Sequence, residues 1–396
     1  MSNKKKMDKY AKRRLVLKII VAILIVLIIY KIFFKIKPVK NEDTVLVLGG
    51  EVQELENRII VDSLKNIYLS LDDVKKIYDE NLYYDEVNEK VITTFNKHIA
   101  ILNLDEKEIV INDAKSNING ALRKMENELY LPFSDMEIVY DFEYNYCESS
   151  NTVIVDSISN EKITAKALKK VSVKNKPGAF SKKLAKLNVD EEVTVLEKQK
   201  KCYKIRTSTG LIGYVNAKKI GEPQSIRKEM NISKLKDVEV LFNYSDISGN
   251  YNEINVNSDK YNVVVPNIFS ISENKNIELK ITPTSEKYKK YISLLEKNNI
   301  NLWATITNDV EVSKIMLTYD ERKEVINNIY YKLIENNYKV LNINFEKIND
   351  INSFYRFLIE LTPRLREAGI KTVVTYNDVM NEEKVLKIVD YLVKDE

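Results

Sequence analysis

Three polar residues at alternate positions, Asn342, Asn344 and Glu346, form the part of this 396-residue chain that could do chemistry at one place. Ile343 and Phe345 alternate with them, which is the pattern of a half-buried strand. Alternation puts the three polar side chains on one face of that strand. A carboxylate at the end of a strand can act as a general acid. Glu346 is therefore the candidate acid, with Asn344 as its neighbour.

Helical patterns on both sides of this strand would hold it in place. Before it, Thr318 and Glu321 form a capping box, and apolar residues then recur every three or four positions. After it, a second apolar stripe is disturbed at Pro363 and ends at Gly369. A strand between two helices indicates a parallel sheet, so we expect Glu346 at the carboxyl edge of that sheet.

The whole region 238–396 alternates strand and helix patterns, which indicates the βα units of an α/β (TIM-type) barrel. A complete barrel has eight such units and typically about 250 residues. This region has room for six strands, so we expect an incomplete barrel. The candidate strands are Val238–Asn243, Tyr261–Pro266, Asn301–Ile306, Val340–Phe345, Lys371–Tyr376 and Asp390–Val393.

The same region resembles the family 18 glycoside hydrolases, particularly their branch associated with bacterial walls and spores. The resemblance implies cleavage of N-acetylhexosamine polymers such as chitin or peptidoglycan, in which the substrate's own acetamido oxygen is the nucleophile. It rests on Val265-Pro266-Asn267-Ile268-Phe269-Ser270, Asn301-Leu302-Trp303-Ala304, Asn342-Ile343-Asn344-Phe345-Glu346 and Leu361-Thr362-Pro363-Arg364-Leu365.

The resemblance also implies roles for individual residues. Glu346 takes the place of the general acid that protonates the leaving oxygen. Asn344 takes the place of an Asp that orients the acetamido group and offsets positive charge on the cyclic intermediate. Asn342, Trp303 and Phe269 are candidate ligand contacts; for Trp303 the alternative is core packing.

Two departures from the family pattern affect the expected activity. Asn344 brings no negative charge to a developing cation, and removing one preorganised electrostatic group commonly costs about 10²–10³ in rate. The sequence reaches Lys394-Asp395-Glu396 where the family places a Met-x-Tyr-Asp stretch. We therefore expect a degenerate domain that binds wall glycan without efficient catalysis. The alternatives are an active, substrate-assisted retaining glycosidase, and a structural envelope protein that acts through another of its domains.

Upstream, residues 15–34 form an apolar run that is long enough to span the hydrocarbon core, about 30 Å thick. A basic tail, residues 1–14, precedes it, so the N-terminus should stay cytoplasmic. Because small residues of a cleavage site do not follow the run, we expect an uncleaved signal anchor with residues 41–396 outside the cell.

Residues 45–156 read as several short strands and one helix of an α+β domain, with Ser70 as the helix cap. The segments 68–74, 83–85 and 128–133 resemble the copper amine oxidase N-terminal-like domain of Gram-positive surface proteins. Copper binding is not expected, because His98 is the single histidine of the chain and is interpreted as a surface strand residue.

Residues 163–222 alternate as half-buried strands do, with Gly210 and Gly213 as hairpin glycines. The segments 173–177 and 210–215 resemble the bacterial SH3-like domain, a small all-β barrel that often binds peptide or glycan. Tyr203 and Tyr214 are candidate groove residues; the alternative is that both belong to the core.

Charge and composition exclude several classes of function. Residues 1–40 carry a net charge of +11, which leaves −7 for the remainder of a chain whose total is +4. A folded part that is mildly acidic argues against nucleic-acid binding. Cys147 and Cys202 lie too far apart in sequence to suggest a zinc site, so we expect neither a metal nor another cofactor.

Overall fold

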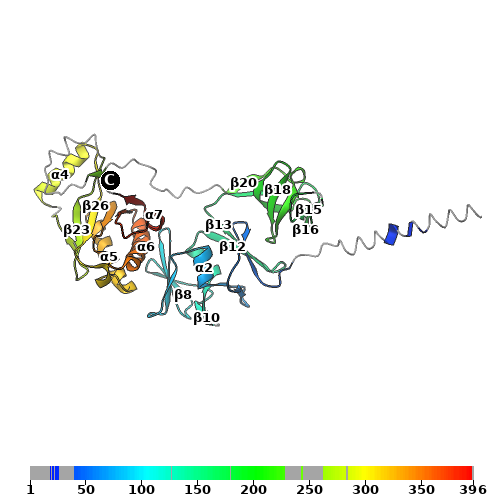
Figure 1. Ribbon diagram of the computed structural model, residues 1–396, viewed down its shortest axis with the longest axis horizontal. Coiled ribbons are helices and arrows are strands. Elements are labelled where there is room, and N and C mark those ends of the chain that lie inside the picture. The colour runs from blue at the N-terminus through cyan, green and yellow to red at the C-terminus, as the bar shows by residue number, and fades with distance from the viewer. Residues whose placement is uncertain are drawn as a thin grey trace, which may run out of the picture. The chain divides into compact units, whose positions relative to one another are not determined.

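A computed structural model of the protein describes residues 18, 20–21, 23–25, 40–125, 127–178, 180–227, 242–243, 262–281 and 284–394 (Figure 1). The anchor expected at 15–34 lies largely outside these residues. Within the described part of the chain, no helix is long and apolar enough to cross a membrane.

The protein is a mixed α+β chain that contacts divide into two compact units. The first consists of Met1–Glu54 and Tyr144–Glu229, and the second of Leu55–Glu143 and Met230–Glu396. The region 45–156, which the sequence indicated as one domain, therefore contributes strands to both units.

The first unit contains a four-stranded and a seven-stranded sheet. The four-stranded sheet has the order β12-β13-β1-β2, with β1 parallel to β13. Its strands are β1 (Val45–Leu48), β2 (Glu51–Val52), β12 (Phe142–Cys147) and β13 (Thr152–Ser157). Arg206 links the two sheets, because both of its terminal nitrogens donate to the Asp156 carboxylate. Burial of Asp156 opposes its ionisation, but the Arg206 hydrogen bonds outweigh burial and lower its pKa.

The seven-stranded sheet is antiparallel, with the order β16-β15-β19-β18-β17-β14-β20. Alternate residues such as Val171, Val173, Val193 and Val195 fill its core. Its elements are β14 (Lys162–Lys166), β15 (Val171–Lys174), β16 (Lys183–Leu187), β17 (Glu192–Lys198), β18 (Cys202–Thr207), β19 (Ile212–Asn216), the 3₁₀ turn η2 (Ala217–Lys219) and β20 (Gln224–Arg227).

Of the two glycines expected in a hairpin, only Gly210 is in the turn, at a φ of 81°. Gly213 lies inside β19 and pairs with Ile205. A Cβ at Gly213 would lie 2.5 Å from Val173 Cγ1 and 2.7 Å from the Lys174 carbonyl oxygen. This position therefore requires glycine because β15 approaches its backbone closely. The requirement does not come from a turn.

The second unit begins with two small antiparallel sheets, of order β5-β6-β7-β8-β9 and β10-β11-β4-β3. The helix α2 starts where the sequence predicted, because the Ser70 side chain accepts a hydrogen bond from the Asp73 N–H. The elements are β3 (Ile60–Val61), β4 (Ile67–Ser70), α2 (Leu71–Ile77), β5 (Tyr83–Asp85), β6 (Lys90–Phe95), β7 (His98–Asn103), β8 (Glu108–Ile111), β9 (Ala114–Asn117), β10 (Arg123–Met125), β11 (Glu128–Pro132) and η1 (Phe133–Ile138).

The second unit continues with βα units, drawn in yellow to red in Figure 1. Parallel pairs join β21 to β22 and β22 to β25. Further parallel pairs join β23 to β26, β26 to β27, β27 to β28 and β28 to β29, in chain order. Strand β24 pairs with β23 in the antiparallel direction. The strands are β21 (Phe242–Asn243), β22 (Val263–Val264), β23 (Asn267–Ile271), β24 (Ile277–Leu279), β25 (Asn301–Leu302), β26 (Ala304–Asn308), β27 (Val340–Asn344), β28 (Lys371–Thr375) and β29 (Tyr391–Val393).

The described residues between these strands form four α-helices and one 3₁₀ turn. They are α4 (Glu286–Lys297), η3 (Val312–Lys314), α5 (Tyr319–Glu335), α6 (Ile351–Glu367) and α7 (Glu382–Ile388). The capping box predicted for α5 is present in both directions. The helix α6 runs through Pro363 and ends before Gly369, whose φ is 71°. Packing on both of its sides holds α6 helical in spite of the proline.

Helix α6 is buried on two faces, which explains why it is the most enclosed helix of the described barrel-like part. Phe354, Phe357 and Leu361 face the parallel sheet, as the apolar stripe predicted. Glu360 and Thr362 are also buried, on a helix whose outer side β6 and β7 contact. Tyr355 is buried beside the start of α7, where its hydroxyl accepts from the Asn381 N–H. The upstream sheet therefore takes the place of solvent over the outer face of α6.

A buried ion pair joins these two parts of the second unit. The Arg322 guanidinium on α5 donates to both carboxylate oxygens of Glu360 on α6, at 2.9 Å for the closest pairs, and each side chain is about 1% exposed. Tyr83 of β5 donates its hydroxyl to Glu360 at 2.7 Å and accepts from Arg322 at 2.8 Å. We call Tyr83, Arg322 and Glu360 the buried clamp.

Burial and charge act in opposite directions within the clamp. Burial raises the pKa of Glu360 and the Arg322 charge opposes that rise. Burial disfavours the charged form of Arg322, but the neighbouring Glu360 outweighs it and raises the pKa of the guanidinium. The pKa of Tyr83 is raised by burial and then by the Glu360 charge, so its hydroxyl stays protonated and available as a donor.

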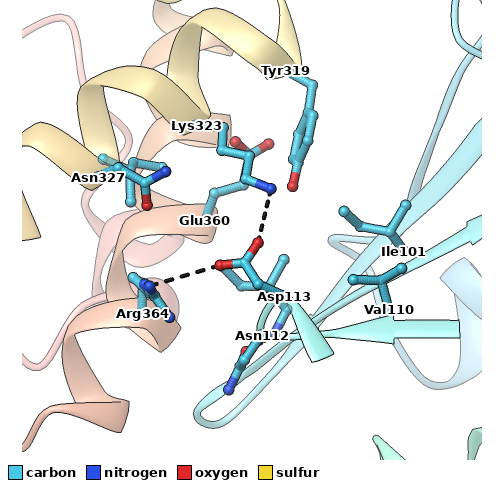
Figure 2. A pocket seen from close by; sticks show the side chains of 11 residues that line it. Ile101, Val110, Asn112, Asp113, Tyr319, Lys323, Asn327, Glu360 and Arg364 are labelled. Atoms are coloured by element: carbon cyan, nitrogen blue, oxygen red, sulfur yellow. Dashed lines mark hydrogen bonds and ion pairs between the residues drawn. The ribbon is translucent and has the colours of Figure 1, made fainter. Parts of the chain in front are cut away.

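A small cavity of about 30 Å³ lies beside the clamp, between β7, β8 and the helices α5 and α6. Figure 2 shows its polar rim, where Lys323 donates to Asp113 at 2.8 Å and Arg364 lies 3.7 Å from the same carboxylate. The hydrogen bond from Lys323 lowers the pKa of Asp113. These pairs add a second set of contacts between the helices α5 and α6 and the sheet that contains β5, here at the turn between β8 and β9.

Candidate functional site at the carboxyl edge of the parallel sheet

Strand β27 lies between β26 and β28 and brings the predicted polar residues to one face of the sheet. Asn342 pairs with Thr305, and Asn344 pairs with Thr307. Paired residues on parallel strands point to the same face, so successive layers of polar residues run toward the carboxyl edge. Glu346 follows the last layer, two residues beyond the end of β27.

Asn342 forms the lower layer of this face and is wholly buried. Its Nδ2 donates to Thr305 Oγ1 at 3.1 Å, and its Oδ1 accepts from Thr375 Oγ1 at 3.1 Å. The three side chains connect β26, β27 and β28 across the face. Asn342 was predicted as a ligand contact; its burial and hydrogen bonds make it part of the support beneath the site.

Two asparagines on the neighbouring strands fix the backbone around Glu346. Asn308, at the end of β26, accepts from the Glu346 N–H at 3.0 Å and donates to the Lys347 carbonyl at 3.1 Å. Asn377, which follows β28, donates to the Phe345 carbonyl at 3.4 Å. The sequence analysis did not select either residue. Their only signal is their place just beyond a candidate strand, where polar residues gather around a site.

Phe345 anchors the same segment from the other side. Its ring lies 5.6 Å from that of Phe354 and 5.7 Å from that of Phe357, both on α6. Phe345 is 1% exposed, whereas the Glu346 side chain is exposed. The alternation predicted from the sequence therefore continues past the strand: the apolar ring enters the core and the carboxylate leaves it.

The chemistry available at this edge is that of one carboxylate and one neutral amide. Among the residues that the structure describes, nothing donates a hydrogen bond to the Glu346 carboxylate. Asn344 is half-buried and supplies both a donor and an acceptor. Such groups can form hydrogen bonds with a neutral polar ligand, and Asn344 contributes no charge to this edge.

The structure places the aromatic candidates away from this edge. Trp303 is 8% exposed and packs with Val263, Val265 and Val373. It precedes Thr307 by four strand positions, about 13 Å along the sheet, and so lies near the amino end. Phe269 is 1% exposed and meets Tyr338 edge-on in the core behind the sheet. Ligand contacts of Trp303 and Phe269 stay predictions, and the core packing that was the alternative for Trp303 accounts for its position.

Tyr203 and Tyr214 lie in the first unit, on the adjacent strands β18 and β19. Both are half-buried, and Tyr203 packs against the core of the seven-stranded sheet. Tyr214 pairs with Lys204 across the strands. They therefore lie in a different unit from Glu346.

The described residues contain no group of three or more His, Cys, Asp or Glu side chains that could hold a metal ion. His98 begins β7 and is half-buried, and burial lowers its pKa. Cys147 and Cys202 are free thiols. The buried clamp brings one acidic and one basic side chain together, each about 1% exposed, but it lies on the other side of α6 from the parallel sheet.

No family model matches the sequence, and no curated protein matches it. Among solved structures, the chain is similar to the spore cortex-lytic enzyme SleL of Bacillus megaterium, with 15% identity over 39% of this chain and 41% of that one and a TM-score of 0.33. It is also similar to a chitinase from Chromobacterium violaceum, with 18% identity over 39% and 54% and a TM-score of 0.33.

A class V chitinase from Pseudomonas fluorescens is similar at 14% identity over 39% of this chain and 53% of that one, with a TM-score of 0.35. The chain thus spans between 41% and 54% of the lengths of these three structures.

Proposed function

We propose that this protein is a membrane-anchored cell-envelope protein whose barrel-like part binds an N-acetylhexosamine polymer of the cell wall without cleaving it efficiently. The observation that carries the proposal is the position of Glu346. Its carboxylate leaves the carboxyl edge of the parallel sheet on the face that also presents Asn344, where α/β barrels hold their ligands.

The support for binding is the construction of that edge. Asn308 and Asn377 hold the backbone on both sides of Glu346, and the Asn342 hydrogen bonds hold the layer beneath it. A glycan-binding edge needs polar groups in fixed positions, because each hydrogen bond then forms with little loss of side-chain entropy. The resemblance to family 18 hydrolases implies that a sugar's acetamido group would lie beside Asn344.

The argument against efficient hydrolysis rests on charge and exposure. Substrate-assisted cleavage develops positive charge beside the position that Asn344 occupies, and an amide does not offset that charge. A general acid is effective where water is excluded and surrounding dipoles are preorganised. The Glu346 side chain is exposed. Both features reduce transition-state stabilisation more than they reduce binding of the intact polymer.

The proposal for the other parts of the chain follows from the sequence. Residues 15–34 would anchor the protein with residues 41–396 outside the cell. The copper amine oxidase N-terminal-like and SH3-like regions would act as spacer and wall-binding parts, with Tyr203 and Tyr214 facing a ligand of the latter. Cell fractionation, with protease applied to intact cells, tests the topology: protection of the 41–396 region would overturn it.

Hydrolysis is tested with the full-length chain in a non-ionic detergent. We expect release of products from chitooligosaccharides and purified peptidoglycan to be no faster than for Glu346→Gln. Turnover clearly above that variant would show an active glycosidase. We expect Asn344→Asp to remain inactive because Glu346 is still exposed; activity in this variant would show that a single charge was missing.

Binding is tested by calorimetry with chitohexaose. Asn344→Leu keeps the size of the side chain but removes its hydrogen bonds, and we expect about tenfold weaker binding, the effect of one lost hydrogen bond to a ligand. Asn188→Leu, at an exposed asparagine of the first unit, should leave the affinity unchanged. Equal affinities for both variants and the unmodified chain would contradict a glycan site at this edge.

A further inference from the structure

A polar groove of about 680 Å³ opens within the second unit, on the outer side of the parallel sheet. One wall comes from the end of α2 and the segment that leads into β5. The other wall comes from the first turns of α6 and α7. The groove residues used below are Lys75, Asn81, Tyr83, Asn352, Arg356 and Lys384.

The groove lies at the same edge of the sheet as the proposed glycan site. Helix α6 begins at Ile351, five residues after Glu346, and α7 begins at Glu382, after β28. The first turns of both helices therefore lie at the carboxyl edge of the parallel strands. A polymer that crosses the edge at Glu346 could continue outward past Asn352 and Arg356 into the groove.

Positive charge exceeds negative charge along the groove. Four cations line it, Lys75, Arg356, Lys384 and Lys387, against two carboxylates, Glu80 and Glu383. Both carboxylates lie within 4 Å of Lys387, at 3.5 Å and 3.6 Å. In the described part of the chain, the other three cations have no carboxylate partner within 4 Å, although Asp350 and Glu360 act on Arg356 at longer range.

The two aromatic rings of the groove support cations. The Arg356 guanidinium lies 4.2 Å from the centre of the Tyr83 ring, and the Lys384 ammonium lies 4.3 Å from the centre of the Tyr355 ring. Tyr83 is 8% exposed and Tyr355 is 6% exposed. Their faces are therefore not open for stacking, whereas the two cations above them remain exposed to solvent.

We infer that this groove binds an anionic portion of the polymer, namely an N-acetylhexosamine glycan that carries carboxylates. This inference rests on the proposed function, because it extends the same glycan site outward along the sheet edge. The cations match the acidic groups of such a polymer, and Asn81 and Asn352 can bind its hydroxyls. A nucleic acid fits less well, because base stacking needs open aromatic faces.

Tyr83 is a positioning residue for the groove. Its ring supports Arg356 on the groove side, while its hydroxyl is held by Glu360 and Arg322 on the buried side. The buried clamp thereby sets the place of one groove wall relative to the other. Tyr83→Phe keeps the ring but loses the hydroxyl, so it should weaken binding of the anionic probe less than removal of the cations does.

The test uses the full-length chain and three probes: chitohexaose, a hyaluronan octasaccharide, and a thymidine oligonucleotide of equal charge. The variant Lys75→Gln/Arg356→Gln/Lys384→Gln removes the three unpaired cations. The control, Lys289→Gln/Lys290→Gln/Lys297→Gln, removes three exposed lysines around a shallow hollow on α4. Each exposed contact contributes modestly, so we expect about tenfold weaker hyaluronan binding for the groove variant and no change for the control.

The outcomes separate this inference from the proposed function. Unchanged chitohexaose binding by the groove variant, together with weaker hyaluronan binding, supports the inference. If hyaluronan binds but chitohexaose does not, the proposed glycan site at Glu346 is contradicted, whereas the inference of an anion-binding groove is supported. Hyaluronan that binds no better than chitohexaose, an equal loss in the α4 control, or oligonucleotide binding as tight as that of hyaluronan would each overturn the inference.

Discussion

The carboxyl edge at Glu346 and the buried clamp differ in how each holds its charge. At the edge, a single carboxylate is exposed and neutral amides fix the backbone around it. In the clamp, Arg322 and Glu360 are about 1% exposed, and a tyrosine hydroxyl satisfies both. The carboxylate proposed for the glycan site is therefore exposed, whereas the enclosed charges of the clamp lie where a structural role explains them.

Under the proposed function, burial and electrostatic strength do not mark the functional site of this protein. A perturbed, buried ionisable group in an enzyme often marks the active site. In this protein the clamp lies between the outer face of α6 and the upstream sheet, and its geometry joins two parts of one unit. We therefore expect substitutions in the clamp to lower the free energy of unfolding strongly, and substitutions at the carboxyl edge to lower it little.

The largest effect is expected for Arg322→Met, which leaves the Glu360 carboxylate buried without its cation. Breaking one side of a buried pair costs about 3–5 kcal/mol. Urea unfolding of the full-length chain can be followed by the fluorescence of Trp303, the single tryptophan, which reports on the second unit. Lys323→Met removes the neighbouring exposed pair and should cost less than about 1 kcal/mol. Equal losses of unfolding free energy in the two variants would show that the buried pair stabilises the protein no more than the exposed pair does.

Tyr83→Phe should have the next largest effect on unfolding. It removes one hydrogen bond donated to Glu360 and one accepted from Arg322, and bonds to charged groups contribute about 1.5–3 kcal/mol. The same urea titration measures it. Tyr84→Phe, on the neighbouring position of β5, is the matched control and should change the midpoint little. An unchanged free energy of unfolding in Tyr83→Phe would show that water replaces the hydroxyl in the clamp.

Asn308→Ala tests the support of the edge. The variant loses the bonds to the Glu346 N–H and the Lys347 carbonyl, which are neutral and close to solvent, so we expect a cost of about 1–2 kcal/mol. It should also weaken chitohexaose binding, because the segment that carries Glu346 loses its orientation. Loss of stability with unchanged binding would show that Asn308 does not position the site.

A smaller effect is expected from Asp113, whose pKa is lowered mainly by the hydrogen bond from Lys323. A carboxylate with a lowered folded-state pKa adds stability above its ordinary value of 3.8 and loses that contribution as the pH falls through the lower value. Because the carboxylate is about half exposed, the difference from Asp113→Asn at pH 7 should be below about 1 kcal/mol. It should shrink below pH 4. A difference in unfolding free energy that grows on acidification would show that folding does not lower the pKa of Asp113.

The smallest effect is expected from Glu346→Gln. An exposed carboxylate without hydrogen-bond partners among the described residues contributes little to folding, so the unfolding free energy should change by less than about 0.5 kcal/mol. Urea titrations of both proteins measure this. A loss of more than 1 kcal/mol would show that Glu346 has a structural role and would remove the contrast between edge and clamp.

The local elements of the second unit could be predicted from the sequence because short-range physics determines them. The capping box at Thr318, the Ser70 cap and the alternation through Asn342, Asn344 and Glu346 all depend on neighbours a few residues apart. The candidate strands in the described part of the region 238–396 are strands of one parallel arrangement. From β23 onward their order also follows, because one α-helix lies between each of the parallel strands β23, β26, β27 and β28 and the next parallel strand of that sheet.

The clamp and the burial of Trp303 could not be predicted in the same way. Glu360 appeared as one polar residue of an amphipathic helix, and nothing local indicates that β5 would cover it. Trp303 occupies a position on the sheet face, and its distance from the carboxyl edge depends on the register with β27. Both are consequences of pairing between distant segments, which local periodicity does not encode.

The long-range bond between Tyr83 and Glu360 also sets an order of events during folding. Each parallel strand pairs with one that precedes it closely, so that part of the sheet can grow unit by unit as the chain is made. The clamp joins residues 277 positions apart and needs α5 and α6 already in place. The upstream sheet must therefore wait, with its apolar face uncovered, until the second half of the chain has been synthesised. In this interval we expect chaperones that shield apolar surface to act on the chain.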